Sequence, residues 1–252
     1  MHALSVALVV AAVLAARPVA AAPTPGRGAG ASGSYLHTRG LDGGAVAVWW
    51  REPLGRAVTV DGTLGVAIGT GADRTTAATL TNPSVAVGAP LAAGTTGYLR
   101  LTLPAASRAG AAGRLATALA AARLIDPAPW QPRTTTLEAG LGRRWRRGLG
   151  EVSLDAGLAW LAVTDASDLP LVHVDAAGAV ALARGLALTA RVRTTAYVLA
   201  ADKREGFVHT LAVGARLRAG PAEVDLAFEV PVDRADRAVD TLAATAAVRW
   251  QL

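Results

Sequence analysis

Strict alternation of apolar and polar residues in the last third of the chain constrains its fold most. In residues 207–218, apolar residues such as Phe207 and Val213 fall on one face, and polar residues such as Thr210 and Arg216 fall on the other. A period of two places successive side chains on opposite faces of a β-strand. After a short turn that contains glycine, the alternation resumes. The sequence therefore predicts antiparallel hairpins with one apolar face.

Two architectures use such hairpins: a soluble sandwich of two sheets, and a membrane barrel whose inner face is polar. The chain of 252 residues is 52% hydrophobic and 17% charged, with a mean hydropathy of +0.35. Outside the N-terminal segment, no apolar run reaches the about 18 residues that indicate a transmembrane helix. The length suits a single all-β domain. These features favour an all-β chain over a helical membrane protein.

The net charge of +6 comes almost entirely from arginine, because Lys203 is the only lysine. No cluster of basic residues with interleaved aromatic residues occurs, so the charge does not indicate nucleic-acid binding. The sequence has no cysteine, which removes disulfide bonds from the stabilising interactions. It also lacks metal-ligand spacing and a phosphate-binding glycine loop. We therefore expect no nucleic-acid partner, no metal and no cofactor.

The N-terminal segment indicates export. Residues 3–16 form an apolar core and small residues follow at 19–22, which is the pattern of a secretory signal peptide with an A-x-A-type cleavage site. We predict a signal peptide over residues 1–21, a low-complexity spacer over residues 22–33, and the folded domain over residues 34–252. The alternative, a short membrane anchor, would need a longer apolar run.

The alternation predicts about twelve strands and one interruption. Between residues 107 and 125, apolar residues recur at helical spacing after Ser107, a candidate N-cap residue, and Asp126-Pro127 ends the run. We predict a short alanine-rich helix inside one long loop. The helix could fold inward as a constriction that adds three arginines, or it could lie on the surface as a solvated element.

The predicted connections alternate in length along the chain. Outer-membrane barrels combine short periplasmic turns with longer outside loops, and both termini lie in the periplasm when the strand number is even. We therefore predict an all-β fold, a transmembrane antiparallel up-and-down barrel of about twelve strands with one short helix in a long outer loop. The short connections are expected at residues 52–55, 147–150, 184–185 and 219–220, and the long ones at 69–76, 105–133, 164–170, 201–205 and 233–240.

With its signal peptide, alternating strands, unequal loops and a final strand that carries Trp250, the chain resembles the small β-barrel proteins of Gram-negative outer membranes. The subfamily is not identified. Family members usually end in Phe or Trp, whereas Gln251 and Leu252 follow the tryptophan here. The resemblance implies an outer-membrane location after cleavage of the signal peptide. It also implies contact with outer-membrane lipid and lipopolysaccharide, and insertion by the barrel-assembly machinery, and it leaves the oligomeric state open.

If the apolar face meets lipid, the polar face is the lumen. Opposite charges on this face would meet across the tight turns, so we predict that Arg216 faces Glu223 and that Arg146 faces Glu151. Such a lumen could be a narrow passive pore for small polar solutes, or a structural barrel neutralised by its own ion pairs. The residues predicted to line the lumen are Asp61, Arg100, Glu138, Arg144, Arg146, Asp155, His173, Asp175, Arg191, Arg193, Arg216, Arg218, Glu223, Asp225 and Glu229.

An outer-membrane hydrolase is the alternative to a pore. His173 and Asp175 share the polar face of one strand, and Ser167 and Asp168 precede that strand in a loop. A catalytic group needs a nucleophile or activated water, a base and an orienting residue within hydrogen-bond reach. The spacing matches no barrel hydrolase motif, so we expect that the chain is not an enzyme. A secreted or periplasmic β-sandwich binding protein is the remaining alternative.

Overall fold

The computed structural model describes residues 26–38, 41–55, 57–71, 74–92, 94–107, 109–121, 128, 131–164, 168–198, 207–232 and 242–251. The predicted signal peptide lies outside these residues. Within them the chain forms thirteen β-strands and one α-helix. The strands are β1 (Gly28–Thr38), β2 (Leu41–Leu54), β3 (Val58–Gly71), β4 (Thr76–Leu80), β5 (Ser84–Ala92), β6 (Thr95–Thr102), β7 (Thr134–Arg147), β8 (Gly150–Val163), β9 (Leu169–Ala183), β10 (Leu186–Tyr197), β11 (Phe207–Ala219), β12 (Ala222–Pro231) and β13 (Leu242–Gln251).

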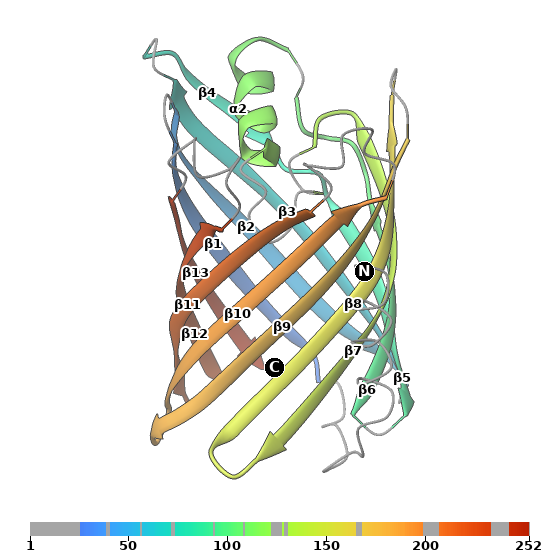
Figure 1. Cartoon of the computed structure of the whole chain (residues 1–252), viewed down its shortest axis with the longest axis vertical. Coiled ribbons are helices and arrows are strands. Elements are labelled where there is room, and N and C mark those ends of the chain that lie inside the picture. Colours follow the sequence, from blue (N-terminus) through green and yellow to red (C-terminus); the bar gives the residue numbers. More distant parts are fainter. Residues whose placement is uncertain are drawn as a thin grey trace.

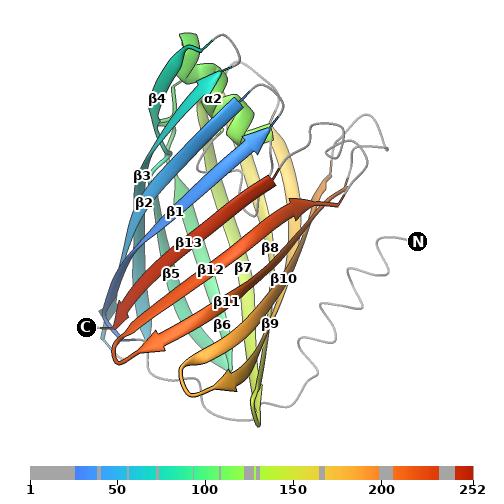
Figure 2. The same ribbon diagram turned by 90° about the vertical axis from the view of Figure 1, so that its left-hand side faces the viewer.

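The strands close into one antiparallel barrel (Figures 1 and 2). Consecutive strands pair, apart from β4 and β5, and β1 pairs with β13 to close the ring. Both β4 and β5 pair with β3, β4 beside residues 66–70 and β5 beside residues 59–63, so together they occupy one position. The barrel therefore has twelve positions. This confirms the predicted fold class, and the sandwich alternative is wrong.

The two faces of the wall differ as the alternation predicted. Val46, Val48 and Trp50 of β2 are each about half exposed, and similar apolar residues stand outward on the other long strands. The strands with 14 or 15 residues exceed the about 9–11 that a tilted membrane strand needs. Closure satisfies the backbone groups of the wall without a free edge, which a lipid environment requires.

The barrel has a short-turn end and a long-loop end. Turns of two or three residues join β2 to β3, β5 to β6, β7 to β8, β9 to β10 and β11 to β12, all at the same end. The C-terminal end of the chain also lies there (Figure 2). Ala219 pairs with Ala222, so the last of these turns is Gly220-Pro221 rather than the predicted 219–220. Gly220 has a φ of 59°, a left-handed conformation that glycine adopts at little cost.

Strand β1 begins at Gly28, inside the stretch predicted as a low-complexity spacer. Its glycines have a packing role there. A Cβ atom at Gly30 would lie 2.6 Å from the ring of Trp49, and one at Gly28 would lie 3.8 Å from the same ring. The indole of β2 thus lies over glycines of β1, a contact that fills the space left by a missing side chain. The first part of this strand was predicted as a spacer because it is rich in Gly and Ser.

Helix α2 (Gly110–Ala121) lies in the long connection between β6 and β7 and begins three residues later than predicted. Residues 122–125 of the predicted helix lie outside the described residues. Ser107 does not cap it, since its hydroxyl accepts a bond from the Ala109 backbone N–H at 3.3 Å, before the helix begins. The helix packs on β4, β3 and β2 at the long-loop end (Figure 1). The inner-face residues Ala45 and Ala67 are buried, and so is Ala116 of the helix. The helix therefore covers the inside of the wall at this end.

No helix among the described residues is long and apolar enough to cross a membrane.

Candidate functional site

A cluster of polar side chains is buried inside the barrel, toward the long-loop end. Glu138 of β7, His173 of β9 and Asp175 of β9 are 4%, 3% and 6% exposed. Alternation places them on the inner face, and the pairing of β8 with β7 and β9 brings β7 and β9 within side-chain reach across β8. Gly157 of β8 leaves the room, because a Cβ atom there would lie 2.5 Å from His173 Nε2.

Tyr98 of β6 joins this cluster through its hydroxyl. The Tyr98 oxygen lies 2.9 Å from Glu138 Oε1, 3.0 Å from Asp155 Oδ1 and 3.4 Å from His173 Nε2. His173 Nε2 lies 2.9 Å from the same oxygen of Glu138. One hydroxyl proton can serve only one carboxylate at a time, so the group is a tightly shared network rather than a set of separate pairs.

Arginines on neighbouring strands neutralise two of the buried acids. Arg100 Nε donates to Glu138 at 3.0 Å, and Arg191 Nε donates to Asp175 at 2.7 Å. Both arginines hold the carboxylate through a second nitrogen as well. Such forked contacts fix geometry as well as charge. The interior is therefore held by ion pairs between adjacent strands.

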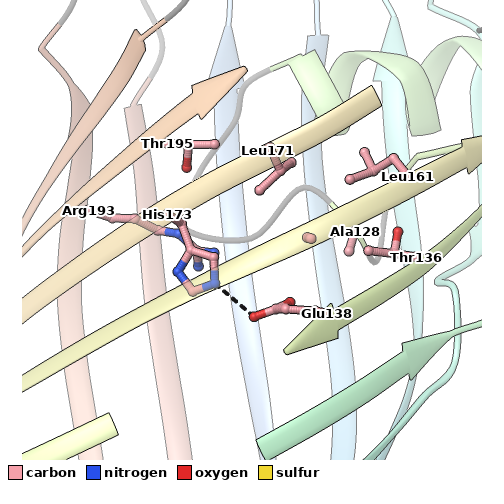
Figure 3. Close-up of a pocket in the computed structure, with 9 residues that line it drawn as sticks. Ala128, Thr136, Glu138, Leu161, Leu171, His173, Arg193 and Thr195 are labelled. Atoms are coloured by element: carbon pink, nitrogen blue, oxygen red, sulfur yellow. Dashed lines mark hydrogen bonds and ion pairs between the residues drawn. The ribbon is translucent and has the colours of Figure 1, made fainter. Parts of the chain in front are cut away.

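A pocket opens beside this cluster, between the wall and the loop that carries Ala128 (Figure 3). Strands β7 to β10 supply both polar and apolar side chains to the pocket. The close-up shows Arg193 next to His173. The lining residues are Ala128, Thr136, Glu138, Ala159, Leu161, Leu171, His173, Arg193 and Thr195.

A second cluster lies at the short-turn end, where the interior is more open. Five arginines surround three carboxylates there, and the side chains of Arg144, Arg146 and Arg218 are more than half exposed. Glu223 alone lies within 3.5 Å of three arginines. We call this set the arginine cluster; it consists of Arg144, Arg146, Glu151, Arg216, Arg218, Glu223, Asp225 and Arg249.

Asn82 anchors the long loop to the barrel wall at the break between β4 and β5. Its side chain is 1% exposed. The amide nitrogen donates to the backbone oxygens of Ala128 and Gln131 at 2.9 and 2.8 Å, and the amide oxygen accepts from the N–H groups of Ala105 and Ala106 at 2.8 and 2.7 Å. One buried amide thus satisfies four backbone groups of the loop that would otherwise be orphaned.

At the long-loop rim, Asp42 accepts hydrogen bonds from His37 at 2.6 Å and from Tyr35 at 3.0 Å. Asp42 is the second residue of a 14-residue strand, beyond the length that crosses a membrane. These two bonds, that from His37 first, lower the pKa of the Asp42 carboxyl below its usual value. The rim is exposed and separate from the buried cluster.

The fifteen residues predicted to line the lumen all lie on strand faces opposite the exposed apolar residues. The structure gathers them into the buried cluster and the arginine cluster, apart from three. Asp61 pairs with Arg51 at 2.6 Å, Glu229 accepts from Thr245 at 3.2 Å, and Arg193 faces the pocket. The expectation that they line an open passage stays a prediction.

One of the two predicted ion pairs differs from the observed one. Arg146 does pair with Glu151, but Arg216 lies opposite Asp225, and Arg218 opposite Glu223, because the last hairpin turn falls one residue later. Arg216 still reaches Glu223 at 3.5 Å diagonally. His173 and Asp175, which the hydrolase hypothesis uses together, do share the inner face, and the imidazole is bonded by Glu138.

Asp168, a loop residue of the hydrolase hypothesis, does not join the site either. Asp168 accepts a bond at 3.0 Å from the indole of Trp160, an outward residue. Ser167 lies outside the described residues. Sequence reasoning also missed Tyr98 and Asn82. Asn82-Pro83 in front of a predicted strand was the available signal, because proline interrupts a ladder.

Known structures share this fold. No family model matches the sequence, and no curated protein matches it. An outer membrane channel from Pseudomonas putida F1 is similar with a TM-score of 0.62 and 9% identity, over 93% of this chain and 98% of that one. The NanC porin is similar with a TM-score of 0.56 and 9% identity, over 89% and 100%. LpxR from Salmonella typhimurium gives 0.54 and 10%, over 88% and 100%.

These similarities show that the chain has the fold of an outer-membrane β-barrel. They also correct one expectation. LpxR is an enzyme with this architecture, so the expectation that the chain is not an enzyme is wrong: the fold does not support it. The physical reason is that one barrel scaffold carries channels and enzymes alike, and the inner side chains decide between them.

Proposed function

We propose that this chain is a narrow outer-membrane channel for small polar solutes, with a preference for anions. The similarity to outer-membrane barrels supports that location. In such barrels the short turns lie in the periplasm, which would place the arginine cluster at the periplasmic mouth. Cleavage of the signal peptide and contact with lipopolysaccharide and the assembly machinery remain part of this proposal.

The arginine cluster is the observation that carries the proposal. Five arginines against three carboxylates leave an excess of positive charge in the open half of the barrel. A charged cleft with low-dielectric walls concentrates ions of the opposite sign. A barrel that needed only internal ion pairs for stability would be expected to balance its charges there.

The other half of the barrel is filled. Helix α2 covers the inner wall, Asn82 fixes the loop, and the buried cluster excludes bulk water. Passage of a solute in this state is therefore narrow, and larger solutes would require the segment between β6 and β7 to move.

Planar-bilayer recordings of the purified chain test the proposal. In a KCl gradient we expect small conductance steps and a reversal potential of the sign that anion flow produces. Arg216→Gln should weaken this preference, whereas Arg184→Gln, at an exposed hairpin turn, should leave it unchanged. An electrically silent barrel, with no solute uptake into vesicles, would leave the structural role in its place.

A hydrolase remains the second candidate, because His173 and Glu138 form a buried imidazole–carboxylate pair. A carboxylate that holds an imidazole is the arrangement of a general base and its orienting group. Lipid or peptide hydrolysis that is lost in His173→Gln, with the barrel still folded, would support this function. Absence of hydrolysis by the wild-type chain would remove it.

A further inference from the structure

We propose that Arg193 is the centre of a binding site for a small monovalent anion, in the pocket between the β7–β10 wall and Ala128. The site deepens the proposed channel function by naming where an anion would pause. It rests on Arg193 having no partner in the described structure, on the lining of the pocket and on the size of the pocket.

Arg193 carries a buried charge without a counter-ion. The residue is 8% exposed, and its Nε is fully buried without a hydrogen-bond partner. A guanidinium cannot lose its proton in a protein, so this charge persists. Across the described part of the chain, no carboxylate lies within ion-pair distance of it. An isolated buried charge is costly unless it is paired.

The nearby acids are engaged elsewhere. Asp175 stands opposite Arg193 in the register of β9 and β10, yet its carboxylate is held by Arg191. Glu138, which also lines the pocket, is held by Arg100. Arg193 therefore lines the pocket with a guanidinium that neither acid pairs.

The pocket supplies further donors and a defined size. The hydroxyl of Thr136 is buried without a hydrogen-bond partner, and Thr195 lies next to Arg193 on the same face. The cavity volume of about 10 Å³ is close to the ~10–15 Å³ that one water occupies by the same measure. A halide ion is somewhat larger than a water molecule, so the side chains of Thr136 and Thr195 would have to move slightly apart to admit one. A larger organic anion would have to displace the loop at Ala128, so we assign the site to halide-sized anions.

Thermal unfolding of the full chain in detergent micelles tests the site without any ion flow. Sodium bromide should raise the unfolding temperature saturably relative to sodium gluconate at equal ionic strength, because a ligand that binds the folded state stabilises it. Gluconate has the same charge but exceeds the pocket. Arg193→Gln should abolish the bromide shift, and Arg184→Gln, an exposed arginine in a turn, should retain it.

If Arg193→Gln does not fold, Arg193→Lys tests the site instead. This variant should need a several-fold higher bromide concentration to reach the same shift in unfolding temperature. No bromide shift in the wild-type chain, or an equal shift in either Arg193 variant, overturns the site. A chain that conducts but shows no shift loses this site and keeps the channel function. A chain that shows the shift but is electrically silent keeps the site and loses the channel.

Discussion

The side-chain amide of Asn82 donates to the backbone oxygen of Ala128 at 2.9 Å, although 46 residues separate the two in the sequence. The same amide bonds Gln131, Ala105 and Ala106. It therefore holds both ends of the segment that contains α2. Because β4 and β6 are not paired with each other, this side chain replaces ladder hydrogen bonds at the break in the wall.

Asn82→Ala should release this segment. Each buried backbone group left without a partner costs about 1–3 kcal/mol, so we expect the segment to open before the barrel unfolds. Limited proteolysis should cut within residues 103–133 faster than in the wild-type chain, and single-channel conductance should rise.

Asn82→Asp provides the graded control. An aspartate keeps the oxygen that accepts from Ala105 and Ala106 but loses the two donated bonds. Its rate of cleavage should lie between the wild-type and alanine values. Equal protection of the segment in all three chains would mean that packing of α2, rather than Asn82, holds the loop.

The fold could be predicted from the sequence because alternation and closure are local rules repeated along the strands. The break between β4 and β5 was not predicted. Strand β4 has only five residues and pairs with β3 alone, so its alternation is too short to mark a separate strand. Strand β1 was assigned too short, because Gly28 and Gly30 read as spacer until Trp49 is placed over them.

The site was predicted only as a set of residues on one face. A register error of one residue in a turn was enough to exchange the partners of Arg216, since cross-strand neighbours depend on turn geometry. Glu138 reaches His173 across the intervening strand β8, a contact that no spacing along the chain encodes. Tyr98 was missed for the same reason.

Tyr98→Phe should destabilise the barrel while leaving its shape intact. The change removes the hydroxyl that Glu138 and Asp155 share and leaves the buried carboxylate of Glu138 and the partly exposed one of Asp155 with one donor fewer. We expect a loss of about 1–3 kcal/mol in the free energy of unfolding, measured by urea titration in lipid vesicles.

Tyr35→Phe is the matched control for this prediction. Tyr35 also donates to an aspartate, at 3.0 Å, but its side chain is exposed at the rim. Water can replace that bond, so the unfolding transition should match that of the wild-type chain. Equal losses in the two variants would show that the interior around Tyr98 is as wet as the rim.

Gly157→Ala should disturb the imidazole of His173. The new Cβ would lie 2.5 Å from Nε2 and 3.1 Å from the backbone oxygen of Ala139, so the ring must leave its present position beside Glu138. Overpacking of this kind costs about 1–3 kcal/mol. Gly178→Ala on β9 is the control, since its Cβ would meet only a backbone oxygen at 3.8 Å. Thermal unfolding that shifts equally in both variants would contradict the close approach.

Glu223→Gln should change both stability and selectivity. Glu223 lies within ion-pair distance of Arg216, Arg218 and Arg249, and its side chain is only 15% exposed. Neutralising it leaves three arginines close together without their shared carboxylate, so we expect a lower unfolding temperature. The decrease should be largest at low salt, where the repulsion between the arginines is least screened.

The same change removes a negative charge from the arginine cluster, and the reversal potential in a KCl gradient should therefore move further toward anion preference. Glu52→Gln serves as the control, because Glu52 pairs with one exposed arginine, Arg27, at the rim of the short-turn end. That variant should leave both measurements near the wild-type values. If Glu223→Gln left both the unfolding temperature and the reversal potential unchanged, the arginine cluster would be bathed in bulk water and would not set the field at the mouth.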